Sequence, residues 1–128
     1  PEAEVILPRF APGNFSELLA AMVNGSLRTF IPQIRSESTC AVVLAAEGYP
    51  GDVRHGDVIH GITDHANVWV DCAAVKQKGA ELITAGGRVL TVVARAHDAA
   101  TAQSMAYEAV QKISFRGMHY RRDIGAHY

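Results

Sequence analysis

The sequence has 128 residues, the length of one ordinary domain or of one domain with part of another. Hydrophobic residues make up 48% of it and charged residues 20%, a balance that excludes global disorder. The formal net charge of −1 gives no reason to expect binding to nucleic acid or to an anionic membrane. No apolar run approaches the roughly 20 residues that a membrane helix needs, and no signal-peptide pattern is visible. We therefore expect a cytoplasmic globular protein.

The first third of the chain is expected to contain one short helix. Two prolines and a glycine argue against a helix over residues 5–13. Asn14 and Glu17 then have the spacing of a capping box, and apolar residues recur at helical spacing, which predicts a helix over residues 15–24. Residues 26–37 have mixed polarity and contain a proline, so we interpret them as a linker or an edge segment.

The middle of the chain has the pattern of short strands separated by turns. The continuously apolar run 40–46 is ended at once by glycine and proline, which favours a strand over a helix. Lys78 and Gly79 make a turn between two further runs. The β-branched and apolar run 88–96 is typical of a buried strand. The predicted strands are residues 40–46, 58–61, 68–75, 81–84 and 88–96.

A second helix is predicted over residues 99–113, with Asp98 as its N-cap. The short connections between the preceding strands favour antiparallel pairing. The predicted fold class is therefore α+β: a small antiparallel sheet or barrel-like domain with one packed C-terminal helix, preceded by the helix over residues 15–24.

The sequence gives little support for a metal site or for a catalytic thiol. His55, His60 and His65 are spaced five apart, which suits neither a strand face nor a helix face, so we interpret them as surface histidines. Cys40 and Cys72 form neither a disulfide framework nor a metal-binding pair. Both lie in predicted apolar strands, where a buried cysteine is usually an inert small hydrophobe. We expect no metal site.

Phosphate binding is the best candidate chemistry. Gly86 and Gly87 directly precede Arg88, and glycines let backbone amides approach an anion while Arg offers a bidentate fork. Lys76 lies on the facing arm of the predicted hairpin, where its ammonium is able to converge with Arg88. The alternative is a tight turn followed by a solvated arginine.

Two further segments are ambiguous. The loop 47–51 has two glycines around Tyr49, which suits closure over a ligand or a plain turn. Arg121 and Arg122 precede Asp123, which suits an anion site, a solvated surface or a local ion pair.

Five short segments occur in an order and at a spacing that resemble a known family. They are Leu7-Pro8-Arg9, Ala46-Glu47-Gly48-Tyr49-Pro50-Gly51, Gly56-Asp57-Val58-Ile59, Thr84-Ala85-Gly86-Gly87-Arg88-Val89-Leu90 and Tyr120-Arg121-Arg122-Asp123-Ile124-Gly125. Together they resemble the C-terminal part of the glycinamide ribonucleotide synthetase (phosphoribosylamine–glycine ligase) family of the ATP-grasp superfamily. Each motif alone is weak, but five in order are specific, and they cover essentially the whole chain.

The resemblance implies two parts. Residues 1–36 correspond to the C-terminal end of an ATP-grasp domain, and residues 37–128 correspond to the family's separate C-terminal domain. The family's magnesium-ligand run reaches this chain only at Pro1-Glu2. The absence of Met at position 1 agrees with a trimmed chain or a piece of a longer protein. We expect no catalytic residue here and no activity from this chain alone.

The implied reaction joins glycine to 5-phosphoribosylamine in de novo purine biosynthesis, with cleavage of ATP to ADP and phosphate. The carboxylate of glycine attacks the γ-phosphate to form an acyl phosphate, and the amine of phosphoribosylamine then displaces phosphate. ATP and Mg²⁺ or Mn²⁺ are the implied cofactors of the complete enzyme, and none is expected to bind this chain alone. The implied partners are the remainder of the ligase chain, 5-phosphoribosylamine and glycine.

By analogy with related purine-pathway ATP-grasp enzymes, Lys76 and Arg88 are implied to hold the ribose 5-phosphate, with Gly86 and Gly87 shaping the turn. The family's His-Ala-Gly-Thr-Lys run is Cys72-Ala73-Ala74-Val75-Lys76 here, so the lysine is retained but its approach differs. Candidate residues at the edge of the active site are Glu2, Tyr49, Arg121 and Arg122. The alternative function is a stand-alone small-ligand-binding or subunit-interaction module of the same fold.

Overall fold

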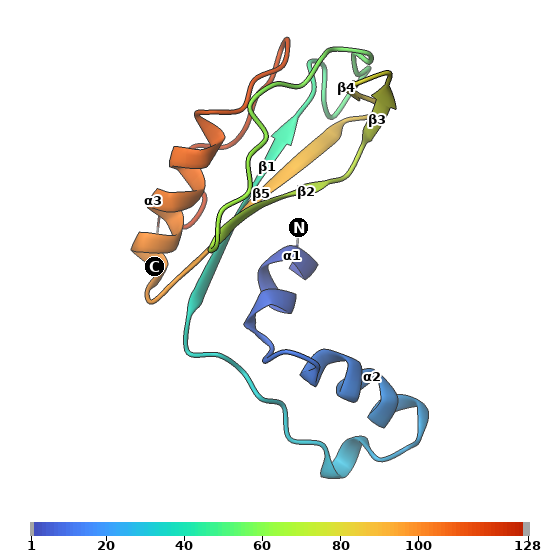
Figure 1. Ribbon diagram of the computed structural model, residues 1–128, viewed down its shortest axis with the longest axis vertical. Helices are drawn as coiled ribbons and strands as arrows, with labels where there is room; N and C mark the ends of the chain where they lie inside the picture. The colour runs from blue at the N-terminus through green and yellow to red at the C-terminus, as the bar shows by residue number, and fades with distance from the viewer. Residues whose placement is uncertain (1, 127–128) are drawn as a thin grey trace.

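The computed structural model describes residues 2–126 and has the expected α+β fold. Its five strands are β1 (Ser38–Ala45), β2 (Val68–Cys72), β3 (Val75–Lys78), β4 (Glu81–Thr84) and β5 (Arg88–Ala96). Three of them form an antiparallel sheet of order β1-β5-β2, with β5 in the middle (Figure 1). β3 and β4 form a separate antiparallel hairpin.

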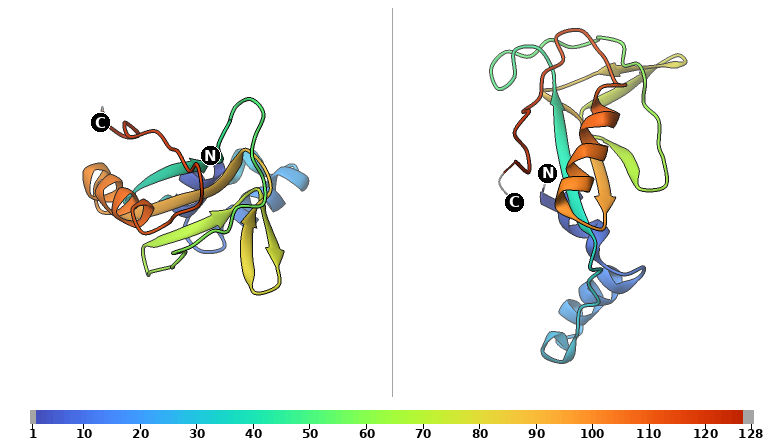
Figure 2. Two further views of the ribbon diagram at one scale, coloured as in Figure 1. Left: turned by 90° about the horizontal axis from the view of Figure 1, so that it is seen from above. Right: turned by 90° about the vertical axis from the view of Figure 1, so that its left-hand side faces the viewer.

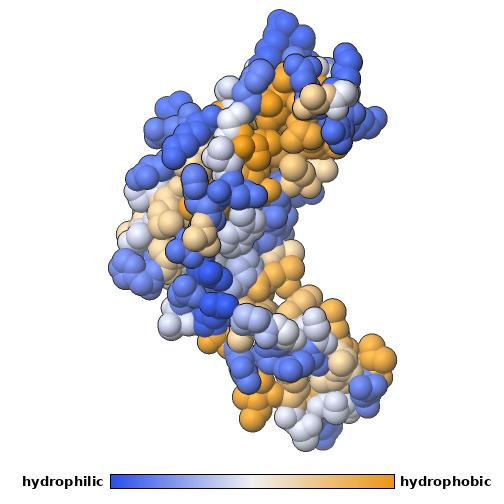
Figure 3. All heavy atoms as spheres, in the orientation of Figure 1, coloured by the Kyte–Doolittle hydropathy of each residue, from blue (hydrophilic) through white to orange (hydrophobic). Residues whose placement is uncertain are grey.

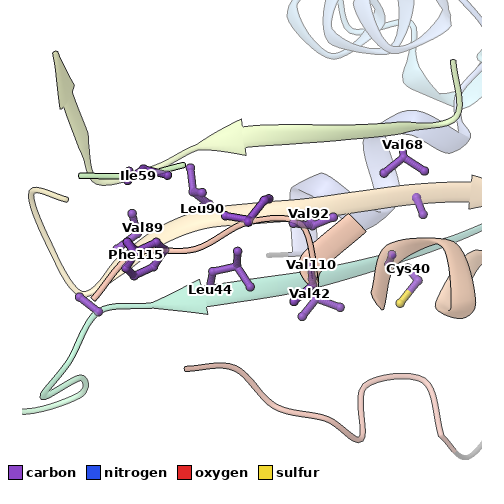
Figure 4. Packing of buried hydrophobic residues seen from close by; sticks show 14 of the residues in the cluster. Cys40, Val42, Leu44, Ile59, Val68, Val89, Leu90, Val92, Val110 and Phe115 are labelled. Atoms are coloured by element: carbon purple, nitrogen blue, oxygen red, sulfur yellow. The ribbon is translucent and has the colours of Figure 1, made fainter. Parts of the chain in front are cut away.

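The main core lies between the three-stranded sheet and helix α3 (Ala99–Val110). Alternate side chains of a strand point to opposite faces, so every second residue of β1 and β5 reaches this core. Val42 lies opposite Val92 and Leu44 lies opposite Leu90, and all four side chains are fully buried (Figure 4). Burial of this apolar surface is the dominant favourable contribution to folding.

Helix α3 begins as the sequence predicts. Asp98 is its N-cap: the Asp98 carboxylate accepts hydrogen bonds from the Thr101 backbone amide at 2.8 Å and from the Thr101 hydroxyl at 2.9 Å. The helix ends at Val110, before the predicted end, but Ile113 is still buried against the core after a short turn. The predicted helix is therefore confirmed with a shorter C-terminal end.

The N-terminal segment contains more helix than expected. Helix α1 (Glu2–Ile6) and a 3₁₀ turn (Leu7–Arg9) precede α2 (Asn14–Val23), and a second 3₁₀ turn covers Leu27–Thr29. The prediction that residues 5–13 exclude a helix is wrong at its N-terminal end. The reason is that Pro8 lies in the first turn of the 3₁₀ helix, where a backbone N–H is not needed.

Helix α2 confirms the predicted helix over residues 15–24, but its capping differs. Gly13 is the N-cap, and Asn14 is already helical. The Asn14 side-chain amide donates to the Glu17 carboxylate at 3.0 Å, and its carbonyl oxygen accepts from the Gln33 backbone amide at 2.6 Å. The capping-box prediction is therefore wrong, because Asn14 joins α2 to the chain that returns toward β1.

Two strand predictions change in detail. The predicted strand 68–75 is divided into β2 and β3, because the chain leaves the three-stranded sheet after Cys72 to enter the hairpin. The predicted strand 58–61 contributes only isolated bridges, Val58 with Ile83 and His60 with Ser114. The turn at Lys78 and Gly79 is confirmed.

Residues 2–37 project beyond one end of the sheet, with α1 resting on β1 and β5 (Figure 2). The Thr39 hydroxyl donates to the Val5 carbonyl at 2.6 Å, which anchors α1 to β1. Many apolar side chains of this segment lie on the surface (Figure 3). No helix within residues 2–126 has both the length and the apolar character needed to cross a membrane. The exposed large hydrophobic side chains of the segment are Ile6, Leu7, Leu19, Met22, Val23, Leu27, Ile31 and Ile34.

Candidate functional site

A groove of about 530 Å³ lies on the face of β1 that points away from α3. Its floor is apolar, because the alternate residues Ala41, Val43 and Ala45 face it. Cationic and aromatic side chains form its walls. We call it the Arg88 groove, and its lining residues are Ala41, Val43, Ala45, Tyr49, Pro50, Arg88, His119, Tyr120, Arg121 and Ile124.

The turn before Arg88 needs its glycines for steric reasons. A Cβ atom on Gly87 would clash with Cδ2 of the Tyr49 ring, and a Cβ atom on Gly86 would lie 2.7 Å from the Ala74 Cβ. Both contacts are too close for a Cβ atom, so neither position accepts a residue other than glycine without a local shift. The Tyr49 ring and Ala74 therefore pack directly on the backbone that presents Arg88.

The loop that carries Tyr49 is tied to this turn near both of its ends. The Ala46 amide donates to the Gly87 carbonyl at 2.8 Å, and the Gly56 amide donates to the Thr84 carbonyl at 2.8 Å. The Asp57 amide also donates to the Thr84 hydroxyl at 3.1 Å. These hydrogen bonds keep Tyr49 and Arg88 together although they are distant in sequence.

Arg88 also lines a neighbouring hollow of about 540 Å³, together with Glu2, Glu4 and Thr91. Glu2 lies close enough for the two charges to interact. The pKa of Glu2 is lowered, chiefly by a hydrogen bond from its own backbone, with a smaller contribution from the positive charge of Arg88. The exposed Arg88 therefore has an acidic neighbour on one side and the apolar groove on the other.

Arg121 reaches the groove with its charge already paired. Its guanidinium donates to both carboxylate oxygens of Asp123, at 2.9 and 2.6 Å, and this ion pair raises the pKa of Arg121. The Arg121 carbonyl accepts a hydrogen bond from the Tyr107 hydroxyl at 2.7 Å. Arg122 is exposed and does not line the groove.

Lys76 lies outside the residues that line either hollow. It is exposed on β3, opposite Ile83 of β4. Ala74 and Tyr49 pack against Gly86 and Gly87, as described above. Of the predicted site residues, the structure brings Arg88, Tyr49 and Arg121 together in one groove. Glu2 joins Arg88 in the neighbouring hollow.

His119, Tyr120 and Ile124 line the groove but are absent from the predicted site. They reach it because the tail after α3 pairs with the end of β1: the Ala45 amide donates to the His119 carbonyl at 2.9 Å. No local pattern reveals such a pairing. The family motif that contains Tyr120 and Ile124 is the one sequence feature that marks this stretch.

The predicted surface histidines are confirmed, because His55, His60 and His65 are all exposed. Cys40 is buried as expected, but the expectation for Cys72 is wrong: it is exposed at the end of β2, where the chain leaves the sheet. Desolvation raises the pKa of both thiols. Within residues 2–126, no three His, Cys, Asp or Glu side chains gather into a group able to hold a metal ion.

Comparisons with known proteins agree on one family. The family model described as phosphoribosylglycinamide synthetase, C domain, matches residues 39–127. A protein named phosphoribosylamine--glycine ligase from Synechocystis sp. is 41% identical over 128 residues, which cover 98% of this chain and 30% of the relative. A protein of the same name from Caldanaerobacter subterraneus is 34% identical over 128 residues, with 100% of this chain and 30% of the relative covered.

A longer protein and a solved structure also match the chain. The trifunctional purine biosynthetic protein adenosine-3 of Gallus gallus is 37% identical over 128 residues, covering 98% of this chain and 13% of that protein. The crystal structure of a phosphoribosylamine--glycine ligase from Thermotoga maritima superposes with a TM-score of 0.82 at 34% identity, covering 97% of this chain and 30% of that one. The chain thus spans about 30% of the length of the ligases it matches. It belongs to the family of the phosphoribosylglycinamide synthetase C domain.

Proposed function

We propose that this chain is the C-terminal part of a phosphoribosylamine–glycine ligase, which joins glycine to 5-phosphoribosylamine with cleavage of ATP to ADP and phosphate. The observation that carries this proposal is the match of the whole chain to proteins of that name, of which it spans about 30%. Its own contribution is to bind phosphoribosylamine through the 5-phosphate.

Arg88 is the residue best placed for that contribution. Its guanidinium lines a groove whose other arginine, Arg121, is paired with Asp123. A planar guanidinium binds phosphate through two parallel hydrogen bonds, which fixes the orientation of the ester as well as its charge. Gly86 and Gly87 shape the turn, and Lys76 on the neighbouring hairpin is a second candidate cation, although it does not line the groove. Positioning of this kind is a main source of catalysis in phosphoryl transfer.

Residues 1–36 are proposed to complete an ATP-grasp domain. Their exposed apolar side chains support this, because Val23 is 87% exposed and Ile31 is 81% exposed, and surfaces of this kind usually meet another protein surface. The proposed partner of these side chains is the remainder of the ligase chain.

ATP and Mg²⁺ or Mn²⁺ are the proposed cofactors of the full-length ligase, and we propose that they bind outside this chain. Glycine and phosphoribosylamine are the proposed substrates. We place the reaction in the cytoplasm, because both cysteines are free thiols, as is usual for proteins of a reducing compartment.

The test is Arg88→Ala in the full-length ligase that carries this chain. We expect the KM for phosphoribosylamine to rise at least tenfold, because a charged hydrogen-bond partner of the phosphate contributes roughly 1.5–3 kcal/mol. The KM for ATP is expected to stay unchanged. Arg116→Ala, at an exposed arginine outside the groove, is the matched control. An unaltered KM for phosphoribosylamine in Arg88→Ala would refute the phosphate role.

A further inference from the structure

Tyr49 stands apart from the other large hydrophobic side chains of residues 38–126. Its side chain is 40% exposed, whereas the other exposed large hydrophobic residues within the described chain all lie between Ile6 and Ile34. It lines the same groove as Arg88. An aromatic ring left open in a small groove with a few polar groups is typical of ligand contact.

The ring packs against the turn that carries Arg88. It packs on Gly87, where no side chain would fit, and Gly87 is the residue immediately before Arg88. The Tyr49 amide donates to the Ala46 carbonyl at 3.1 Å, and the Ala46 amide donates to the Gly87 carbonyl at 2.8 Å. A ring already packed against the backbone loses less conformational entropy on ligand binding than a free one.

The rest of the groove indicates what the ligand presents to this ring. The floor of Ala41, Val43 and Ala45 is apolar, and the volume of about 530 Å³ lies within the usual range of small-molecule sites. Inorganic phosphate has no apolar surface to place against such walls. A phosphorylated sugar has one, because the C–H groups of its ring form an apolar face that an aromatic ring is able to cover.

We propose that Tyr49 determines the specificity of the Arg88 groove for a phosphorylated pentose over bare phosphate, an inference that rests on the phosphate role proposed above. Arg88 holds the phosphate, and the Tyr49 ring covers the C–H face of the pentose. The structural basis is that one turn positions both residues: Gly87 carries the ring on its backbone and Arg88 follows it.

The experiment is isothermal titration calorimetry of the 128-residue chain with two probes, inorganic phosphate and ribose 5-phosphate. We expect the wild-type chain to bind ribose 5-phosphate more tightly. Tyr49→Ala is expected to weaken ribose 5-phosphate binding about tenfold, the effect of losing a modest apolar contact, and to leave phosphate binding unchanged. Tyr49→Phe keeps the ring and is expected to keep the preference.

Further variants distinguish the specificity role of Tyr49 from the phosphate role of Arg88. Arg88→Ala is expected to weaken both probes, whereas Tyr49→Leu, which keeps an apolar contact on Gly87, is expected to weaken only ribose 5-phosphate. If the Tyr49 variants leave the ratio of the two affinities unchanged while Arg88→Ala weakens both probes, the specificity role is wrong and the phosphate site stands. If the wild-type chain binds neither probe, or Arg88→Ala affects neither, the phosphate site itself fails. Thermal unfolding of each variant verifies that it is folded.

Discussion

Residues 2–37 and residues 38–126 are both rich in apolar side chains, but they bury them differently. In the second region, Leu44, Leu90 and Val110 are fully buried between the sheet and α3. In the first region, α1 has no buried residue, and the buried residues of α2 are Asn14 and Ala21. Only the second region therefore has a core of its own. Residues 38–126 therefore supply the stability of this chain, whereas residues 2–37 leave most of their large apolar side chains on the surface.

The largest expected effect tests the core of the second region. Leu90→Ala should reduce the free energy of unfolding by about 3 kcal/mol, because the side chain is fully buried near the start of β5 and its loss leaves a cavity. Urea denaturation measures the change. Leu19→Ala removes the same atoms from a half-exposed position of α2 and is the matched control, with an expected loss below about 0.5 kcal/mol. Equal losses of unfolding free energy in Leu90→Ala and Leu19→Ala would contradict the conclusion that only residues 38–126 have a core of their own.

A smaller effect is expected where the core helix begins. Hydrogen bonds from Thr101 lower the pKa of Asp98. A lowered pKa in the folded state means that the stabilisation is complete above the pKa of the unfolded chain and is lost as the pH falls through the folded-state pKa. Asp98→Ala should therefore lower the Tm by roughly 4 °C at neutral pH and have little effect in strong acid.

Calorimetric or circular-dichroism melting over a range of pH measures this difference. Asp98→Asn is the control, because asparagine caps a helix about as well as aspartate but does not titrate. It should keep most of the Tm and lose the pH dependence. A constant difference between wild type and Asp98→Ala at all pH values would show that the carboxylate is not the stabilising group.

The smallest effect in the chain itself is expected in the first region. Val23→Asp should change the free energy of unfolding of the 128-residue chain by less than about 0.5 kcal/mol, because the side chain is almost fully exposed. In the full-length ligase the same change should lower the Tm clearly, since it would place a charge in a covered apolar surface. Arg116→Asp is the control at an exposed position of the second region. The proposed docking of residues 1–36 is wrong if Val23→Asp is harmless in both settings.

Local sequence patterns predict correctly those elements whose boundaries depend on neighbouring residues. The sequence predicts a strand over residues 88–96 and β5 lies there, because a β-branched run between a glycine turn and an N-cap has few alternatives. The N-cap Asp98 was predicted for the same reason. Helix α1 departs from the prediction because Pro8 lies in the first turn of the following 3₁₀ helix, a position where a helix tolerates proline.

The sequence predicts only some of the residues that line the Arg88 groove, because the others reach it through contacts that are distant in sequence. Arg88 and Tyr49 belong to motifs that are visible in the sequence, and they meet in the groove. His119 arrives through its pairing with Ala45, and Asn14 bonds to Gln33 instead of closing a capping box. Contacts between residues this far apart depend on the tertiary fold. They leave no periodicity in the sequence for a pattern to detect.

The central position of β5 also determines when the core is able to form. β1 pairs only with β5 in the three-stranded sheet, from Ser38 opposite Ala96 to Ala45 opposite Arg88, and β2 pairs with the other edge of β5. During synthesis both earlier strands therefore remain without their sheet partner until β5 has been made. Long-range pairing of this kind slows folding and leaves apolar strands exposed meanwhile. The residues that follow, in α3, complete the core almost as soon as the sheet is assembled.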